Sequence, residues 1–171
     1  MTDKPLLESR ERQPYMGIRL RANGEAEFRH AADTGFPELF GWLGEQGIAP
    51  AGAPMIRYRA LDADGFPTDF DIGAPVARAV EGNGRIGPGE LPAGDYAVLV
   101  HVGPYRHEDV PDLRAARERL VAWAEAEGLE LAREESGGAV TFAACVESYL
   151  TDASREPDWT KWETELAFLT T

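Results

Sequence analysis

The fold is decided by residues 139–169, which read AVTFAACVESYLTDASREPDWTKWETELAFL. Apolar and polar residues alternate near both ends of this stretch, so it predicts two antiparallel strands joined by a loop. One face of the first strand is apolar, formed by Phe142, Ala144, Val146 and Leu150. Its opposite face carries Glu147 and Tyr149. In the second strand, Leu166 lies on the face opposite Glu165.

The apolar faces of both strands need a partner, and residues 110–127 supply one. Their apolar stripe predicts an amphipathic helix that packs on these faces. We therefore expect Glu147, Tyr149 and Glu165 to lie together on the side of the sheet that points away from this helix. Carboxylates beside an aromatic ring attract a cation with apolar bulk. The alternative is the solvated outer face of an antiparallel sheet.

The composition narrows the class of protein. A net charge of −13 is opposite to what phosphate binding needs, so we expect no nucleic-acid partner. No apolar run approaches about 18 residues, which predicts no membrane span. The first residues lack the apolar core of a signal peptide, and the single cysteine, Cys145, cannot form an internal disulfide. Both features predict a cytoplasmic protein, with Cys145 as a small buried residue.

Metal and cofactor chemistry has no sequence support. His30, His101 and His107 have neither metal-ligand spacing nor a cysteine partner. The glycines around Asn83 lack the lysine and hydroxyl residue that follow in a phosphate-binding loop. We expect no metal and no cofactor.

The first half of the chain predicts a strand–helix–strand–strand unit. Alternation and turn residues indicate three strands, at 14–21, 54–61 and 66–72. Between the first two, an apolar stripe predicts a helix from about Phe36 to Gln46. We expect Asp33 or Thr34 to cap its start and Gly47 to end it.

The second half predicts the same order of elements. Residues 81–94 are dense in glycine and proline, which predicts a connector without regular structure. An unbroken apolar run at 96–102 predicts a buried strand. The helix expected at 110–127 ends before Gly128, and the two strands of residues 139–169 complete the unit.

Local details repeat between the halves. A tryptophan, Trp42 or Trp123, precedes the glycine at the end of each helix by five residues. Tyr58 and Tyr149 lie on the strand that follows each helix. Matches in register of this kind predict an internal duplication.

The duplication predicts an α+β fold. Two βαββ units would be related by pseudo-twofold symmetry, with antiparallel sheets, helices on one side and a groove between the halves. We expect a single domain over residues 1–171, with a first half at about 12–76, a connector at 77–94 and a second half at 95–171.

A groove between repeats is a usual place for a small ligand. Glu147, Tyr149 and Glu165 would then lie on its floor or wall, and four aromatic residues are candidate walls, namely Trp42, Tyr58, Tyr105 and Trp123. For several of these residues the sequence also supports another role. Trp123 lies on an apolar helix stripe, which favours core packing, Tyr58 and Tyr149 suit groove or core equally, and Glu165 could be solvated.

Short motifs along the chain occur in a characteristic order. They are DFDIGAPV at 69–76, LPAGDY at 91–96, HVGPY at 101–105, LVAW at 120–123, VESY at 146–149 and TEL at 164–166. In that order they resemble the GyrI-like family, the effector-binding domain of multidrug-responsive regulators. The resemblance covers about residues 10–171.

The resemblance implies a duplicated βαββ fold that forms a concave, two-lobed module. It also implies a groove that binds hydrophobic, often cationic molecules through aromatic rings and glutamates. Glu147 is the strongest match to the carboxylate that faces a ligand's positive charge, with Tyr149 on the same strand face and Glu165 on the next strand. Trp123 and Tyr105 match possible walls.

Three functions follow from these observations. The first is a stand-alone module that senses or sequesters hydrophobic, cationic small molecules, because no DNA-binding helix pair precedes the first expected strand. The second is a hydrolase, since some relatives resemble enzymes that open cyclopropane rings of DNA-alkylating natural products. Glu147 would be its general base, and Tyr149 or Tyr105 its acid.

The third function is an acidic interaction module that inhibits a protein partner, as the family's name-giver does with a DNA topoisomerase. The charge of −13 could mimic DNA and meet a basic surface. Acidic residues gathered on one outer face would favour this function over the other two.

Overall fold

The computed structural model describes residues 4–171. Within them the chain forms antiparallel strands, two α-helices and one short 3-10 helix. In chain order the elements are β1 (Leu6–Arg10), β2 (Gln13–Arg21), α1 (Glu25–Glu45), β3 (Met55–Leu61), β4 (Pro67–Pro75), β5 (Ile86–Leu91), β6 (Gly94–Val102), α2 (Leu113–Ala126), β7 (Arg133–Ser136), β8 (Ala139–Tyr149), the 3-10 helix (Trp159–Lys161) and β9 (Glu163–Leu169).

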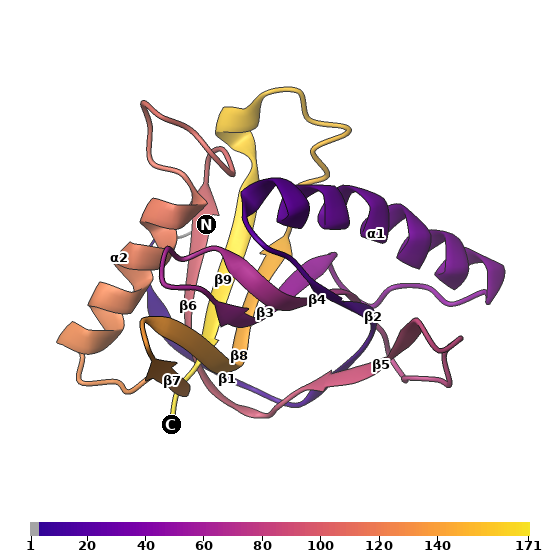
Figure 1. The fold of residues 1–171 in the computed structure, drawn as a ribbon, viewed down its shortest axis with the longest axis horizontal. Coiled ribbons are helices and arrows are strands. Elements are labelled where there is room, and N and C mark those ends of the chain that lie inside the picture. The colour runs from indigo at the N-terminus through magenta and orange to yellow at the C-terminus, as the bar shows by residue number, and fades with distance from the viewer. Residues whose placement is uncertain (1–3) are drawn as a thin grey trace.

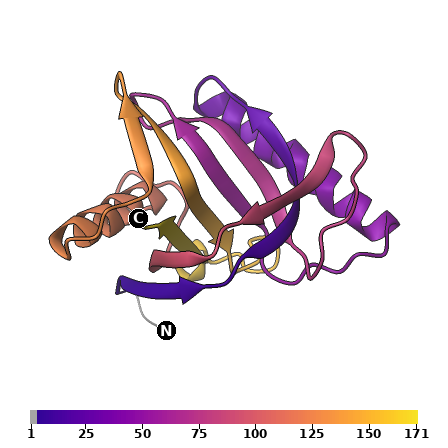
Figure 2. The same cartoon turned by 90° about the horizontal axis from the view of Figure 1, so that it is seen from below.

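All the strands belong to one curved sheet (Figures 1 and 2). Its strand order is β1-β6-β9-β8-β3-β4-β2-β5, with β7 paired to β8 outside this path. Both helices contribute to one large core on the same face, where Leu39 and Leu43 of α1 and Leu120 of α2 are fully buried. The predicted α+β fold with helices on one side is therefore confirmed. No helix within residues 4–171 is long and apolar enough to cross a membrane.

The sheet shows the predicted duplication directly. Strands β2, β4 and β3 of the first repeat are arranged as β6, β9 and β8 of the second, and β3 pairs with β8 to join them. In this pairing Ile56 lies opposite Glu147. Glu147 follows Ile56 by 91 residues, as Tyr149 follows Tyr58. Two paired residues that occupy equivalent positions lie on either side of the symmetry axis, so the pseudo-twofold axis passes between Ile56 and Glu147.

The leading strand of each repeat is exchanged with the other repeat. β1 precedes β2 in sequence but pairs with β6, and β5 precedes β6 but pairs with β2. The two exchanged strands pair at equivalent positions. Arg10 of β1 pairs with Gly94 of β6, and Leu91 of β5 pairs with Gln13 of β2. Leu91 follows Arg10 by 81 residues, and Gly94 follows Gln13 by 81. The exchange extends the repeat beyond the predicted βαββ unit, and β1 was missed in the sequence because it precedes the first alternating segment.

The predicted start of α1 is wrong. The helix begins at Glu25, directly after Gly24, and not near Phe36. The hydroxyl of Thr34 does not cap a helix start, because it donates to the carbonyl oxygen of His30 one turn earlier in the same helix. The capping propensity of Asp33 and Thr34 therefore misled the sequence interpretation.

Two residues that disfavour a helix, Gly35 and Pro37, lie inside α1. Gly35 packs so closely on the sheet that a Cβ there would lie 2.7 Å from Cδ1 of Ile72. Pro37 cannot donate a backbone hydrogen bond, but the helix continues past it to Glu45. The predicted end is confirmed, because Gly47 follows with a φ of 68° that suits glycine.

Helix α2 begins at Leu113, slightly later than predicted. Its cap is Asp112, whose carboxylate accepts hydrogen bonds from the backbone N–H groups of Arg114 and Ala115, at 3.0 and 3.2 Å. The same carboxylate accepts a third bond from the N–H of His107. Gly128, with a φ of 72°, ends the helix as predicted.

The glycine-rich connector is not irregular throughout, because residues 86–91 form β5. Gly89 in this strand leaves room for the ring of Tyr15, because a Cβ there would lie 2.4 Å from this ring. The Tyr15 hydroxyl donates to the buried Asp71, which fixes the ring in place. The prediction of an unstructured segment is therefore wrong for these residues.

A β-bulge changes the face of one residue in β8. The β3–β8 register shifts between Tyr58 and Ala60. Beyond the shift, Phe142 lies on the helix side, where its ring centroid is 5.7 Å from that of Phe168. The prediction that Phe142 shares a face with Ala144 is therefore wrong, because strict alternation fails at a bulge.

The packing of β5 predicts different effects for two glycines of that strand. We expect Gly89→Ala to lower the free energy of unfolding by about 1–3 kcal/mol, because the new methyl group overlaps the Tyr15 ring. Gly87→Ala is the matched control, since nothing lies within 4 Å of a Cβ at Gly87. Urea unfolding of both variants measures the difference, and equal stabilities would contradict the described packing.

The cap of α2 predicts a pH-dependent effect. Burial raises the pKa of Asp112, but the three backbone N–H groups lower it more, so it lies below its ordinary value of 3.8. Asp112→Ala should cost about 1 kcal/mol at pH 7. Because the folded-state pKa is depressed, this stabilisation is present above pH 3.8 and is lost as the pH falls below it.

Urea unfolding at pH 7 and at pH 3 checks this expectation, and the difference between the wild-type chain and Asp112→Ala should shrink at the lower pH. Asp109→Ala is the control, because Asp109 is exposed and its hydrogen bond to His107 comes from the backbone N–H, which the substitution retains. If Asp112→Ala lowers the free energy of unfolding by the same amount at pH 7 and at pH 3, the charge of the carboxylate does not contribute to the cap.

Candidate functional site

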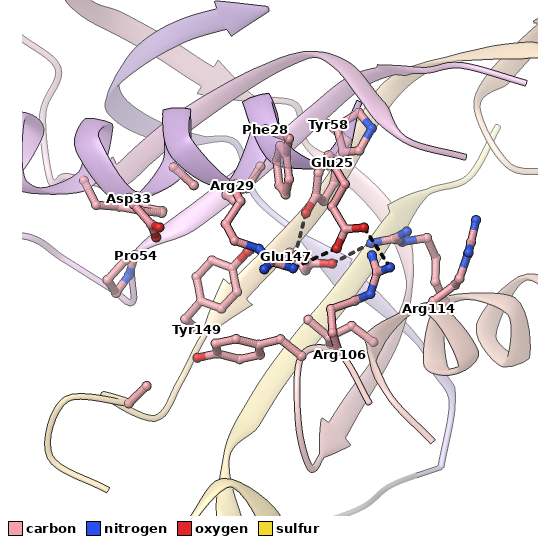
Figure 3. Close-up of a pocket in the computed structure, with 18 of the residues that line it drawn as sticks. Glu25, Phe28, Arg29, Asp33, Pro54, Tyr58, Arg106, Arg114, Glu147 and Tyr149 are labelled. Carbon is pink, nitrogen blue, oxygen red and sulfur yellow. Dashed lines mark hydrogen bonds and ion pairs between the residues drawn. The ribbon is translucent and has the colours of Figure 1, made fainter. Parts of the chain in front are cut away.

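A cavity of about 780 Å³ lies between α1 and α2, over the junction of β3 and β8 (Figure 3). Its apolar lining comes from both helices, the sheet and the loops, and includes Phe28, Ala32, Phe36, Phe40, Pro54, Ile56, Phe66, Leu113 and Leu150. The symmetry axis passes through the cavity floor, because both Ile56 and Glu147 line it. The groove between the halves thus lies on the helix side of the sheet.

The centre of the floor is the carboxylate of Glu147, whose side chain is 3% exposed. One of its oxygens, Oε1, accepts a hydrogen bond of 2.7 Å from Nη2 of Arg117. The other, Oε2, accepts bonds of 2.7 Å each from the hydroxyl groups of Tyr58 and Tyr149. Figure 3 shows the Tyr58 bond and the position of Tyr149 beside it. The buried charge therefore accepts three hydrogen bonds and is paired with a cation.

The two tyrosines reach one carboxylate because of the symmetry. Each lies two residues beyond the axis on its own strand, so both rings approach Glu147 from opposite sides. Burial, followed by the neighbouring Glu147 charge, raises the pKa of Tyr58 and of Tyr149 well above that of an exposed tyrosine. Both hydroxyl groups are therefore protonated donors across the neutral pH range.

The prediction that Glu147 lies on the face of the sheet away from the helices is wrong. Arg117 reaches Glu147 from α2, and Phe36 of α1 lies edge-on to Tyr149 with ring centroids 6.2 Å apart. Glu147 and Tyr149 therefore point toward the helices. Ala144 and Val146 point to the far face, where they are also buried. Since both faces of β8 are buried, alternation alone could not tell which one carries the helices.

Arg117 is held by two interactions at once. Its guanidinium lies over the ring of Tyr58, 5.2 Å from the centroid, while it pairs with Glu147. The side chain is 20% exposed. Burial lowers the pKa of Arg117, but the Glu147 charge outweighs this effect, so the net shift is upward and the group stays charged.

Aromatic rings continue from the floor to one wall. Tyr105 lies 5.5 Å from Tyr149 and 4.7 Å from Trp162, measured between ring centroids. Burial raises the pKa of the Tyr105 hydroxyl. These tilted and edge-on contacts support a rigid, apolar wall.

The mouth of the cavity carries charges of both signs. Glu25 accepts hydrogen bonds from Arg29, at 2.8 Å, and from Arg106, at 3.2 Å, which connects α1 to the loop before α2. Arg114 donates to the carbonyl oxygen of Asp64 at 2.7 Å. Four arginines and four carboxylates line the cavity in all, namely Arg29, Arg106, Arg114, Arg117, Glu25, Asp33, Glu147 and Asp152. The cavity is formally neutral, in contrast to the chain's net charge of −13.

Four of the seven predicted site residues line this cavity, namely Glu147, Tyr149, Tyr58 and Tyr105. Trp42 and Trp123 do not, because both are partly buried against the main core. For Trp123 the core position agrees with its place on the apolar stripe. Whether the four lining residues bind a ligand stays a prediction.

Glu165 lies on the other face of the sheet. It accepts a hydrogen bond of 2.8 Å from Nη2 of Arg10, which belongs to β1, and it does not line the cavity. Glu165 faces away from the helices, as predicted. Glu147 faces toward them, so the sheet separates the two carboxylates that were expected to lie together. The structural role of Glu165 is an ion pair that fixes an edge strand.

Sequence reasoning missed the arginine of the site. Arg117 lies on the predicted helix, directly after Ala116 of the apolar stripe. This position next to the stripe was the signal that could have placed Arg117 toward the core. Phe28 was missed because the first part of α1 was not recognised.

Cys145 is buried as predicted, and burial raises the pKa of its thiol to about 12, so that the thiol is not a nucleophile at neutral pH. Among residues 4–171, no group of three His, Cys, Asp or Glu side chains is placed to hold a metal ion.

Residues 4–166 match the family described as the GyrI-like small molecule binding domain. The sequence has no match among the curated proteins.

Several solved structures share the fold. The C-terminal domain of EcmrR matches with a TM-score of 0.74 and 18% identity, over 100% of this chain and 99% of that one. EcmrR in a complex with DNA matches with a TM-score of 0.77 and 19% identity, over 98% of this chain. The match covers 57% of that EcmrR chain, so the present chain spans little more than half its length.

Two further structures match at lower identity. A hydrolase from Listeria innocua has a TM-score of 0.64 and 12% identity, over 99% of this chain and 92% of that one. SAV2435 bound to tetraphenylphosphonium has a TM-score of 0.53 and 11% identity, over 98% and 94%. At these identities the likeness is one of fold.

The buried ion pair predicts a large and compensable effect on stability. We expect Arg117→Met to lower the free energy of unfolding by about 3–5 kcal/mol, because Glu147 is left as an unpaired buried charge. Arg117→Met combined with Glu147→Gln should recover most of this loss, since no unpaired charge remains. Urea unfolding of the single and double variants measures the coupling, and additive losses would contradict a direct interaction.

Proposed function

Because the chain belongs to the GyrI-like family of small-molecule-binding domains, we propose that the cavity between α1 and α2 binds a hydrophobic small molecule with aromatic rings. The observation that carries the proposal is the cavity itself. Its volume of about 780 Å³ lies within the range of drug-sized ligand sites. Its lining is mainly apolar and aromatic around a few fixed polar groups, which is the usual composition of such sites.

The ligand that we propose is defined by its apolar surface. The sequence predicted a cationic ligand because a free glutamate would attract positive charge. In the structure, Arg117 already neutralises Glu147. SAV2435, which has the same fold, was solved with the cation tetraphenylphosphonium, whose four phenyl rings support the binding of aromatic bulk by a fold of this type.

The geometry favours binding over the predicted hydrolase activity. A general base needs a free lone pair directed at a water molecule. Glu147 accepts bonds from Arg117, Tyr58 and Tyr149, and its side chain is 3% exposed. The likeness to a Listeria innocua hydrolase is one of fold alone. Inhibition of a protein partner stays a prediction from the net charge.

The proposal predicts that filling the cavity prevents binding. The probe is the uncharged fluorophore 6-propionyl-2-dimethylaminonaphthalene, which has two fused aromatic rings and one ketone oxygen. We expect it to bind with a dissociation constant of roughly micromolar size, about −8 kcal/mol. Ala32→Trp should weaken binding at least about tenfold, because Ala32 lines the cavity. Isothermal titration calorimetry measures both values.

The matched control is Ala26→Trp, which places the same side chain on an exposed position of the same helix. This variant should bind the probe as the wild-type chain does. Equal affinity of Ala32→Trp and Ala26→Trp would place the ligand elsewhere, and no binding to any of the three proteins would overturn the proposal.

A further inference from the structure

We infer that Arg117 is a tethered cation that fills the position a ligand's positive charge would take, so that the pocket selects uncharged aromatic molecules over lipophilic cations. The inference rests on the proposed function and names its ligand class. It treats Arg117 as the residue that determines charge selectivity, and Glu147 as its fixed partner.

The surroundings of the Arg117 guanidinium are those of a cation site. A carboxylate oxygen of Glu147 lies 2.7 Å from Nη2, and the face of the Tyr58 ring lies 5.2 Å from the guanidinium carbon. Tyr149 completes the site by donating to the same carboxylate. A carboxylate together with an aromatic face is the combination that attracts an organic cation. Here the chain itself supplies the cation.

The internal duplication gives a comparison within one molecule. Arg117 follows Phe36 by 81 residues, the same offset that relates Trp42 to Trp123, and Glu147 is equivalent to Ile56. Phe36 faces Tyr149 as Arg117 faces Tyr58. The two charged residues thus occupy positions whose counterparts are both apolar, and they contact one another. The charged pair is therefore confined to the second repeat.

A cationic ligand gains little from this arrangement. To reach Glu147 it must displace Arg117, whose guanidinium then loses both its carboxylate and its aromatic partner. Of the other carboxylates that line the cavity, Glu25 already accepts bonds from Arg29 and Arg106. Asp33 and Asp152 are exposed to solvent, which screens their charge. If the ligand leaves the pair intact, its charge meets a neutral group in a partly desolvated pocket, which is unfavourable.

An uncharged ligand with an acceptor oxygen fits the pair as it stands. Within the described residues, Arg117 hydrogen-bonds through Nη2 alone, to Glu147, while the side chain is 20% exposed. A guanidinium has five N–H donors, so other N–H groups of Arg117 can donate to a ketone or phenol oxygen. We therefore assign the pocket to uncharged aromatic molecules that carry such an oxygen.

Two probes of similar shape and opposite charge, tetraphenylphosphonium and tetraphenylborate, test the inference. Their dissociation constants, and that of 6-propionyl-2-dimethylaminonaphthalene, are measured by calorimetry. The proteins are the wild-type chain, Arg117→Met, Glu147→Gln and the variant with both substitutions. Arg119→Met is the control for overall charge, because Arg119 lies exposed on α2 outside the cavity.

We expect Arg117→Met to bind the phosphonium at least about tenfold more tightly than the wild-type chain, and Glu147→Gln to favour the borate. The double variant should bind the two charged probes within about threefold of one another, and Arg119→Met should behave as the wild-type chain. Unfolding curves identify any variant that does not fold. If Arg117→Met does not fold, the double variant and Glu147→Gln still carry the test.

Four results would overturn the inference, and the last of them would leave the proposed function in place. The first is a phosphonium affinity of Arg117→Met within about threefold of the wild-type value, or of the Arg119→Met value. The second is a wild-type phosphonium affinity that Glu147→Gln weakens tenfold, because Glu147 would then serve a ligand cation while Arg117 is present. The third is no binding of any probe to any protein, which would overturn the proposed function as well. Binding of the uncharged probe alone, unaffected by Arg117→Met, would reject the inference and retain the proposed function.

Discussion

The pairing of β3 with β8 is the interaction on which the rest of the structure depends. It joins the two repeats into one sheet and places Ile56 opposite Glu147 across the symmetry axis. The tyrosines that follow these two residues in their strands then converge on one carboxylate. The helices of the two repeats lie on either side of the same axis, so the cavity forms where the repeats meet. A small change in the β3–β8 register would therefore alter the floor of the site and the symmetry together.

The departure from symmetry at this axis has a physical cause. In a true twofold dimer, a glutamate at this position would face its own copy across the strand pair. Two carboxylates in direct opposition in a buried setting repel one another, and one of them would have to be protonated. Here Ile56 occupies one of the two positions, so a single carboxylate is shared by two equivalent tyrosines. Because the repeats are fused in one chain, their sequences could diverge and allow this arrangement.

Much of the fold could be predicted from the sequence, since strands, helices and repeats leave periodic signals. Strands β2, β3, β4, β6, β8 and β9 were predicted near their observed bounds, as were the ends of both helices. The errors occurred where a tertiary contact overrides a local signal. Gly35 reads as a helix breaker, although it permits close packing on Ile72, and Gly89 reads as a loop residue, although it accommodates Tyr15. In each case the reason lies in a residue far away in the sequence.

The site was predicted in part. Glu147 and Tyr149 were identified because they share one face of an alternating strand, and Tyr58 because the duplication makes it the counterpart of Tyr149. Their orientation was not, because Ala144 and Val146 on one face and Cys145 on the other are all buried. Arg117 was missed, since an arginine in a charged helix is usually solvated and only the buried carboxylate on another strand explains its position.

The exchange of β1 and β5 between repeats bears on how the chain reaches its native state. Neither half can complete its sheet from its own residues, because each borrows an edge strand from the other. Leu6 pairs with Val98, and Ile56 with Glu147, so each pairing closes a loop of about 90 residues before it gains any contact. Sequence-distant pairings of this kind slow folding. The chain should thus fold slowly for its length and in one cooperative step, without a native-like state in which only one repeat is formed.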